Sequence, residues 1–239
     1  MQIRYIDFET TGETGEDAKQ ALCEVGWCDI AVTEIDPTTG LLQAELGPRE
    51  GFLVNPGRPM PPEGQAVHHI SDEMVAGAPP PDRVFLELGK GFPDYLAAHG
   101  ADFEQGFYKG HVPWICTYKV ALRLWPDLPT HKLQYLRYAL DIGIDQSLGL
   151  PPHRAVPDAF VGAALMVKII HEGRASIEDM VRWSKGPALL TIMSFGKHRG
   201  KRWDEAPSDY LQWILDKSDL DRDTKANAKH YLKLRDEVF

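Results

Sequence analysis

The stretch Ile3-Arg-Tyr-Ile-Asp7-Phe-Glu9-Thr-Thr-Gly12 combines a short apolar run with two acids spaced two residues apart. Alternate residues of a strand point to the same face, about 6.6 Å apart at a rise of roughly 3.3 Å per residue, so both carboxylates should project together. The turn-forming Thr10-Thr11-Gly12 ends the strand and leaves the acids at an edge that substrate can reach. Two like charges in a buried strand are costly without a ligand, so this stretch predicts a bound cation.

The composition fits one substantial core with a small appendage. The chain has 239 residues, of which 43% are hydrophobic, and its formal net charge is −9. This acidic balance argues against a protein that holds nucleic acid with a broad basic surface. It does not exclude a nuclease, in which a divalent metal would meet the phosphate in place of lysines.

The sequence has no signal-peptide pattern and no apolar run long enough to span a bilayer. We therefore expect a cytoplasmic protein with no membrane partner. Cys23, Cys28 and Cys116 are odd in number and lack a CxxC spacing, which indicates neither a disulfide framework nor a thiolate zinc site. We expect reduced, buried cysteines.

The apolar patterns predict strands in the first third of the chain and mostly helices afterwards. Strands at 3–8, 22–34 and 51–54, with a turn at 36–40, should form an antiparallel meander, and further strands are expected at 95–99 and 114–117. Helices are expected near 71–76, 84–88, 133–140 and 158–170, and one more begins after the capping residue Ser176 and ends at Gly186. The segment with His68 and His69 is expected to be a loop. This order predicts an α/β or α+β fold, a sheet covered by helices.

The last part of the chain has a different character. Residues 190–195 and 201–203 flank a Gly-rich turn and suggest a hairpin, and an amphipathic helix follows from Ser208. We therefore expect a main domain at 1–186 and a small C-terminal α+β module at 187–239.

Two further segments place acids or a histidine at an expected sheet edge or helix start. In Ala98-His99-Gly100-Ala101-Asp102-Phe103-Glu104, the two acids would differ in direction by about 200° on a helix, so only one can face the first pair. His153-Arg154-Ala155-Val156-Pro157-Asp158 places a histidine on a loop and an acid in the first turn of an apolar helix. Taken singly, each is as well explained by a solvated acid or a core histidine. Together, four carboxylates and one imidazole are the set needed for two-metal phosphodiester hydrolysis.

These three segments, in this order, resemble the exonuclease motifs of the DEDDh (DnaQ-like) 3′→5′ exonucleases. The similarity extends through residues 54–57, 66–74 and 114–117, and the tail at 195–201 and 210–213 narrows it to exodeoxyribonuclease X-like members. The resemblance implies an RNase H-like fold, a mixed sheet flanked by helices. It also implies removal of nucleotides from a 3′ end as 5′-monophosphates with two Mg²⁺ ions, which Mn²⁺ could replace.

The resemblance also assigns roles to individual residues. It implies that Asp7, Glu9 and Asp158 are metal ligands and that His153 is the general base. It places other residues of the matched segments at the substrate, and these are Phe8, Thr10, Thr11, His68 and His99. For His68, a structural role with hydrogen bonds to the backbone is an equal alternative. Related exonucleases include homodimers, so a homodimer is left open.

The second motif departs from the family pattern His-Asn-Ala-x-Phe-Asp. Gly100 replaces the Asn, and Glu104 replaces the Asp, while Asp102 falls at the variable position. We take Glu104 as the fourth metal ligand. Its extra methylene adds a torsion that must be ordered, which predicts weaker occupancy of one metal, a preference for Mn²⁺, or reduced activity.

One dense basic cluster lies in the tail and comprises Lys197, His198, Arg199, Lys201 and Arg202, with Phe195 and Trp203 beside it. Basic residues among aromatics suit single-strand binding, so Lys197 and Arg199 are expected to contact nucleic acid. The alternative is a solvated hairpin whose aromatics pack on the C-terminal helix. The sequence thus predicts a 3′→5′ exonuclease acting on DNA, with two alternatives: an exoribonuclease, and a nucleic-acid-binding module weakened in catalysis. The complete set of Asp7, Glu9, His153 and Asp158 argues for the enzyme.

Overall fold

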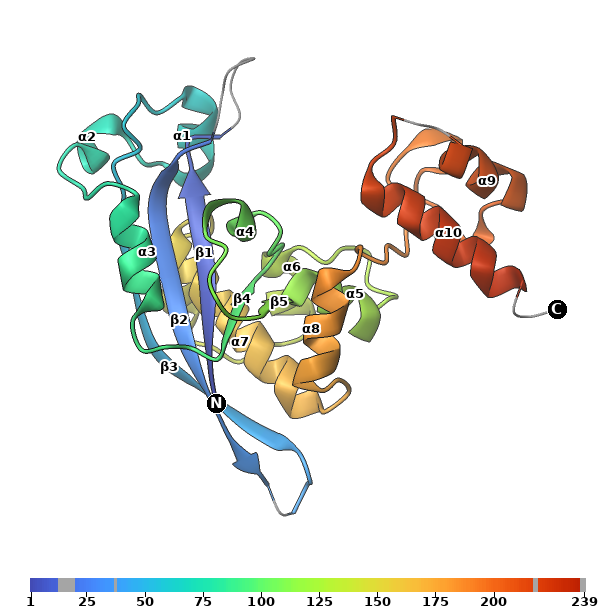
Figure 1. The fold of residues 1–239 in the computed structure, drawn as a ribbon, viewed down its shortest axis with the longest axis horizontal. Helices are drawn as coiled ribbons and strands as arrows, with labels where there is room; N and C mark the ends of the chain where they lie inside the picture. The colour runs from blue at the N-terminus through green and yellow to red at the C-terminus, as the bar shows by residue number, and fades with distance from the viewer. Residues whose placement is uncertain (13–19, 37, 217–218, 237–239) are drawn as a thin grey trace.

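A five-stranded mixed sheet forms the centre of the main domain (Figure 1). The structure is a computed structural model that describes residues 1–12, 20–36, 38–216 and 219–236. Strands β1 (Gln2–Thr10), β2 (Leu22–Ile35) and β3 (Leu42–Leu53) form the antiparallel meander predicted from the sequence. Strands β4 (Tyr95–Ala98) and β5 (Trp114–Cys116) run parallel to β1, in the order β3-β2-β1-β4-β5.

Helices cover both faces of this sheet, which confirms the predicted fold class. Ile3, Tyr5 and Ile30 face a core shared with the long helix α7, whereas Ile6 and Trp27 face a second core shared with α3. The helices of this part are α1 (Pro62–His68), α2 (Asp72–Val75), α3 (Asp82–Gly89), α4 (Glu104–Phe107), α5 (Thr117–Leu124), α6 (Leu133–Ala139), α7 (Ala155–Glu172) and α8 (Ile177–Lys185), with a 3₁₀ turn η1 at Gln146–Gly149. No helix in the described ranges is long and apolar enough to cross a membrane.

Two glycines let α7 lie directly on the sheet. A Cβ atom added to Gly26 of β2 would lie 2.3 Å from the backbone of Ala155, at the start of α7. A Cβ atom at Gly162, two turns later, would lie 2.1 Å from the ring of Tyr5 on β1. Real Cβ atoms do not approach so closely, so only glycine permits this packing. The first turn of α7 is thereby held against the end of the sheet that carries the acids.

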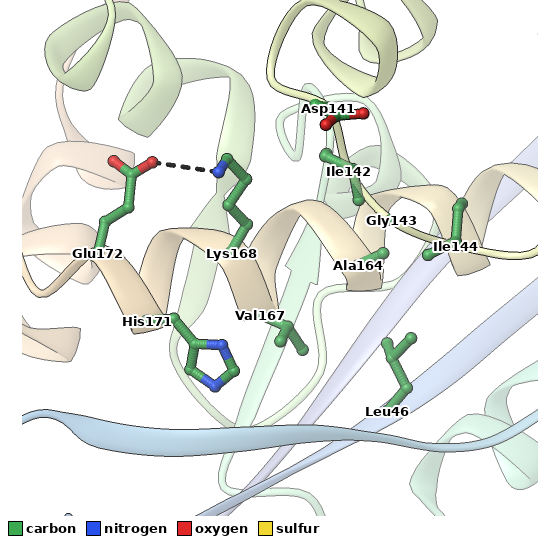
Figure 2. A pocket seen from close by; sticks show the side chains of 10 residues that line it. All are labelled: Leu46, Asp141, Ile142, Gly143, Ile144, Ala164, Val167, Lys168, His171 and Glu172. Atoms are coloured by element: carbon green, nitrogen blue, oxygen red, sulfur yellow. Dashed lines mark ion pairs between the residues drawn. The ribbon is translucent and has the colours of Figure 1, made fainter.

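The other end of α7 covers the outer strand β3. Figure 2 shows Val167 and His171 pointing from the helix towards the strand, across a groove of about 350 Å³. The backbone N–H of Ala44 on β3 donates to Nε2 of His171 at 3.0 Å. On the opposite side of the helix, Lys168 and Glu172 form an ion pair at 3.5 Å (Figure 2). The helix thus satisfies a donor that an edge strand would otherwise leave open.

Residues from about 187 onward form a small module with its own core (Figure 1). Its elements are η2 (Gly196–His198), η3 (Trp203–Glu205), α9 (Ser208–Asp216) and α10 (Arg222–Asp236). The predicted hairpin is present as two paired segments with a single β-bridge, between Ile192 and Arg202. Arg202 also forms an ion pair with Asp127 of the main domain at 3.0 Å. We propose that the boundary lies between residues 186 and 187, because the core of the module contains only residues beyond it.

Several local expectations need correction. His68 lies at the end of helix α1 and not in a loop. Pro61 and Pro62 suggested a break, but proline is well tolerated in the first helical turn, where its missing N–H has no intrahelical partner. Helix α5 was not predicted because it follows β5 without any intervening turn residues. The third strand is longer than expected and begins at Leu42.

Candidate active site

Asp7 and Glu9 lie on the face of β1 that meets α7. They continue the alternation of Ile3 and Tyr5, whose side chains are buried against that helix, and both acids are half-buried. Asp158 lies in the first turn of α7. One carboxylate oxygen from each of Asp7, Glu9 and Asp158 lies within 4.8 Å of the others. The structure therefore brings three of the four predicted metal ligands together as a group that could hold a metal ion.

Glu104 is the fourth predicted ligand, and it begins the short helix α4. Its side chain is only 4% exposed, and its Oε2 atom is buried with no hydrogen-bond partner among the described residues. The pKa of Glu104 is raised to about 8, chiefly by burial, with the charges of Asp102 and Glu9 contributing to the rise. Asp102 has the opposite character, because its side chain is 68% exposed and pairs with Lys119 at 2.8 Å. Of the two acids, Glu104 is thus the one inside the fold and in need of a partner.

The acids of the cluster make each other harder to ionise. Burial raises the pKa of Asp7 well above its usual range, and the charges of Asp158, Glu9 and Glu104 raise it further. For Glu9, burial and the charges of Asp158 and Glu24 raise the pKa to about 8. Burial also raises the pKa of Asp158. A divalent cation would reverse this effect, since it would stabilise every ionised carboxylate at once. The donor set, hard oxygens with one orphaned buried atom, fits such an ion.

Two hydrogen-bond donors hold the carboxylate of Asp158 in place, and the sequence predicted neither hydrogen bond. The side-chain amide of Gln134 on α6 donates to Oδ1 at 2.6 Å, and the backbone N–H of His153 donates to Oδ2 at 2.7 Å. The buried guanidinium of Arg137 contacts Oε1 of Gln134 at 3.5 Å and donates to the carbonyl of Gly149 at 2.9 Å. Arg137 thereby connects the support of Asp158 to the turn that precedes His153.

A second support lies beside Glu9. In the register of β1 and β2, Glu24 stands opposite Glu9. Arg154 binds both oxygens of Glu24, at 2.9 and 2.6 Å, and the backbone N–H of Ala155 donates to the same carboxylate at 2.9 Å. This ion pair anchors the start of α7 to the sheet, and the positive charge of Arg154 partly offsets the effect of Glu24 on the pKa of Glu9. Neither Glu24 nor Gln134 belongs to a motif, and only the strand register and the helix packing reveal their roles.

His153 lies at the rim of the cluster. Its side chain is exposed, and its backbone adopts a left-handed conformation with φ of 60°, which is uncommon for residues other than glycine. The hydrogen bond from its N–H to Asp158 fixes this conformation. The imidazole is therefore open to solvent next to the acids, as a base for water would need to be.

Two other predicted histidines have their ring nitrogens engaged inside the protein. His68 is 1% exposed, and its Nε2 donates to the carbonyl of Thr10 at 3.1 Å while its Nδ1 accepts from the N–H of Ile70 at 3.0 Å. His99 donates to the carbonyl of His131 at 2.7 Å, and burial lowers its pKa to about 4. Direct substrate contact through either imidazole does not fit these bonds. For His68 these bonds favour the structural alternative, in which it supports the end of β1.

The remaining predicted contacts on β1 are buried. The Phe8 ring points away from the acids and packs edge-on against Phe107. Thr10 accepts from the N–H of Gly12, and Thr11 accepts from the N–H of Ala21. These threonine hydroxyls connect the end of β1 to Gly12 and to Ala21, the residue that precedes β2. Lys197 and Arg199 lie elsewhere, in the C-terminal module, where both are exposed.

The chain is similar to known proteins over the whole region that carries the four acids and His153. The model of the RNase T exonuclease family matches residues 5–166, a range that contains all four acids and His153. Exodeoxyribonuclease 10 of Escherichia coli (strain K12) is 30% identical over 237 residues, which cover 97% of this chain and 99% of that protein. A solved structure of exonuclease X in complex with 5′ overhanging duplex DNA is 27% identical, with a TM-score of 0.62, and covers 76% of this chain and 99% of that one. The nuclease domain of 3′hExo, a DEDDh family member bound to rAMP, shares the fold at 17% identity, with a TM-score of 0.54 over 72% of this chain and 92% of its own.

Proposed function

The chain belongs to the RNase T exonuclease family, as a 3′→5′ exonuclease of the DEDDh type, and from this membership we propose that it removes 5′-mononucleotides from DNA 3′ ends. The observation that carries the proposal is the cluster of Asp7, Glu9 and Asp158, three carboxylates with raised pKa values, together with the orphaned buried oxygen of Glu104, whose charge raises the pKa of Asp7 further. Such a cluster is unfavourable in a protein that binds no cation.

Asp7, Glu9, Glu104 and Asp158 would hold two Mg²⁺ ions, with Mn²⁺ as a substitute. When bound, the ions supply Lewis-acid activation and neutralise charge on the phosphate. The residues of the chain do the rest. Gln134 and the N–H of His153 hold the Asp158 carboxylate in one orientation, and Arg154 with Glu24 holds the first turn of α7 on the sheet.

His153 is the proposed general base. Its exposed imidazole can take a proton from the attacking water and return it to solvent, while its backbone stays tied to Asp158. The leaving 3′ oxygen of the shortened strand is protonated from solvent. Substitution by Asn would keep the left-handed backbone, which Asn tolerates well, and would remove only the base.

DNA is the proposed substrate because of the proteins that this chain resembles over most of its length. The E. coli relative is named an exodeoxyribonuclease, and the structure at 27% identity is a complex with duplex DNA. The protein bound to rAMP is 17% identical and supports the fold alone.

The test uses 3′-labelled and 5′-labelled single-stranded DNA, duplex DNA and RNA, with Mg²⁺, Mn²⁺ or EDTA. We expect metal-dependent release of mononucleotides from DNA, lost in Asp7→Asn and strongly reduced in His153→Asn. Glu104→Gln and Asp102→Asn are a matched pair, since both neutralise one acid of the same segment. Only Glu104→Gln should reduce turnover, and equal loss in both would remove Glu104 from the site. Faster release from RNA than from DNA would overturn the substrate assignment.

A further inference from the structure

The C-terminal module exposes one large aromatic side chain on helix α9. Trp213 is 48% exposed and stacks on Tyr210, one turn earlier, with ring centroids 5.4 Å apart and planes at 19°. The aromatics that the sequence suggested for stacking are placed differently. Trp203 is 0% exposed in the module core, and Phe195 packs against it. The outer face of Trp213 is therefore the surface that a planar ligand could reach.

The basic turn of the module is fixed against this aromatic pair. Gly196 has a φ of 64°, and a Cβ atom there would lie 2.2 Å from the hydroxyl of Tyr210, so the turn rests directly on the ring. The Nζ of Lys197 lies 5.1 Å from the centroid of the Tyr210 ring, a cation–π contact. Together with Asp209 and Trp213, these residues line a groove of about 450 Å³.

The charge next to this groove is positive and unneutralised. Lys197, Arg199 and Lys201 are exposed, and none of them forms an ion pair with another residue in the described part of the chain. Arg202 differs, because Asp127 and Asp204 already neutralise it. Asp209 is the one acid lining the groove, and its carboxylate accepts from the N–H of Tyr210. In a chain of net charge −9, Lys197 in the groove with an exposed indole, and two further cations in the same short segment, fit a polyanion with planar groups.

We propose that this surface of the module is a second binding site for the single-stranded part of the substrate, with a base stacked on Trp213 and phosphates at Lys197, Arg199 and Lys201. The proposal rests on the proposed exonuclease function, which supplies the strand. A second groove, of about 380 Å³, lies between the module and the catalytic part and is lined by Tyr118 and Leu122 on one side and Ile192 on the other. In this proposal the strand passes along this groove on its way from the acids to the module.

Binding is measured by fluorescence anisotropy with single-stranded DNA and RNA of about 20 nucleotides, in EDTA, so that cleavage cannot contribute. Trp213→Ala should weaken binding about tenfold, and Trp213→Phe, which keeps an aromatic face, should restore most of it. Phe92→Ala is the matched control, because Phe92 is exposed but lies next to Asp94, at the end of the sheet remote from the acids. Equal losses for DNA and RNA are expected, since stacking and phosphate contacts do not read the sugar.

The salt dependence of binding tests the proposed phosphate contacts of Lys197 and Arg199. Lys197→Gln combined with Arg199→Gln should reduce the slope of log affinity against log salt by about 0.7 for each lost contact. Each of the two single variants is compared with Lys229→Gln on α10, an exposed lysine whose replacement removes the same single charge and should leave the slope unaltered. Circular dichroism and thermal melting of each variant report on the fold.

Cleavage kinetics separate this site from the active site. With Mg²⁺, Trp213→Ala should raise KM for long single strands and leave kcat, and the activity on dinucleotides, unchanged. If the wild type binds single strands in EDTA but cleaves nothing, the exonuclease function fails and the module site stands. If affinity and salt slope are the same in all variants, as for a surface that docks a protein, the module site is refuted and the exonuclease function stands.

Discussion

Strand β1 carries two charged groups that differ in how completely they are paired. Arg4 faces Asp29 across the strand pair and binds both of its oxygens, at 2.7 and 2.8 Å, and it also donates to the carbonyls of Leu88 and Lys90. Three residues later, Asp7 faces Gly26, and Glu9 faces another acid, Glu24. The first group is complete within the chain, whereas the second repels itself. Removing one partner of a buried ion pair destabilises a fold, whereas buried charges that the fold leaves in excess indicate a ligand.

The largest expected effect comes from removing one acid of the self-repelling group. Asp7→Asn should lower turnover by about 10³-fold, the equivalent of several kcal/mol of lost charge stabilisation. The same change should raise the melting temperature of the metal-free protein, because it removes a source of repulsion. Activity assays with Mg²⁺ and calorimetry in EDTA measure the two effects. A lower melting temperature would show that Asp7 has a stabilising partner.

For the ion pair of Arg4 and Asp29 we expect the opposite result, a loss of stability with no loss of turnover. Arg4→Met leaves Asp29 buried without its counter-charge and should reduce the free energy of unfolding by about 3–5 kcal/mol. The kcat of the remaining folded enzyme should not change, because Arg4 does not touch the acids. Urea unfolding and active-site titration separate these quantities. The double variant with Asp29→Asn should recover part of the stability, and the absence of recovery would contradict the pairing argument.

The raised pKa values of the acids predict that the stability of the metal-free protein depends on pH. Glu9 and Glu104 have pKa values raised to about 8, and burial also raises the pKa of Asp7 and Asp158. Between about pH 4.5 and 8 the folded protein holds protons that the unfolded chain has lost. The metal-free protein should therefore lose stability as pH rises through this window, by up to about 1.4 kcal/mol per pH unit for each group. Saturating Mg²⁺ should remove the slope, as thermal melts across pH will show.

Substitution of Gln134 tests whether metal binding depends on the orientation of the Asp158 carboxylate as well as on its presence. Gln134→Leu removes the donor to Asp158 and should weaken metal binding about 10- to 100-fold, a range typical of residues that orient metal ligands. Titration calorimetry with Mn²⁺ measures this without reference to catalysis. Gln134→Asn is the companion variant, because its shorter amide tests whether reach or chemistry decides the effect. Unchanged affinity in the Leu variant would assign Gln134 a purely structural role.

The smallest expected effect concerns the altered second motif. Glu104→Asp shortens the side chain by one methylene and should raise metal affinity only a few-fold, since one torsion less must be ordered. The preference for Mn²⁺ over Mg²⁺ should decrease in the same variant. If neither affinity nor activity rises, the length of Glu104 does not limit this site.

The sequence was informative where a local pattern determines a position. Asp7 and Glu9 share a face because of strand alternation, and Asp158 begins a helix whose apolar run is evident. Glu24 and Gln134 could not be predicted, because their roles depend on strand register and on how α6 packs against α7. For His68 the motif context suggested function, yet the fold turns its ring inward to the backbone of Thr10. Motifs located the acids, and only the tertiary structure identified the residues that support them.

The glycine contacts of α7 bring the acids together during folding, before a metal ion binds. Because the helix lies on the sheet at Gly26 and Gly162, the backbone fixes Asp158 beside Asp7 in the folded chain, whether or not a cation is bound. Folding therefore supplies the energy needed to hold like charges together. An arriving metal ion meets ligands that are already in place, and it loses little affinity to ordering them. The site is preorganised, and a bound cation offsets the mutual repulsion of its carboxylates.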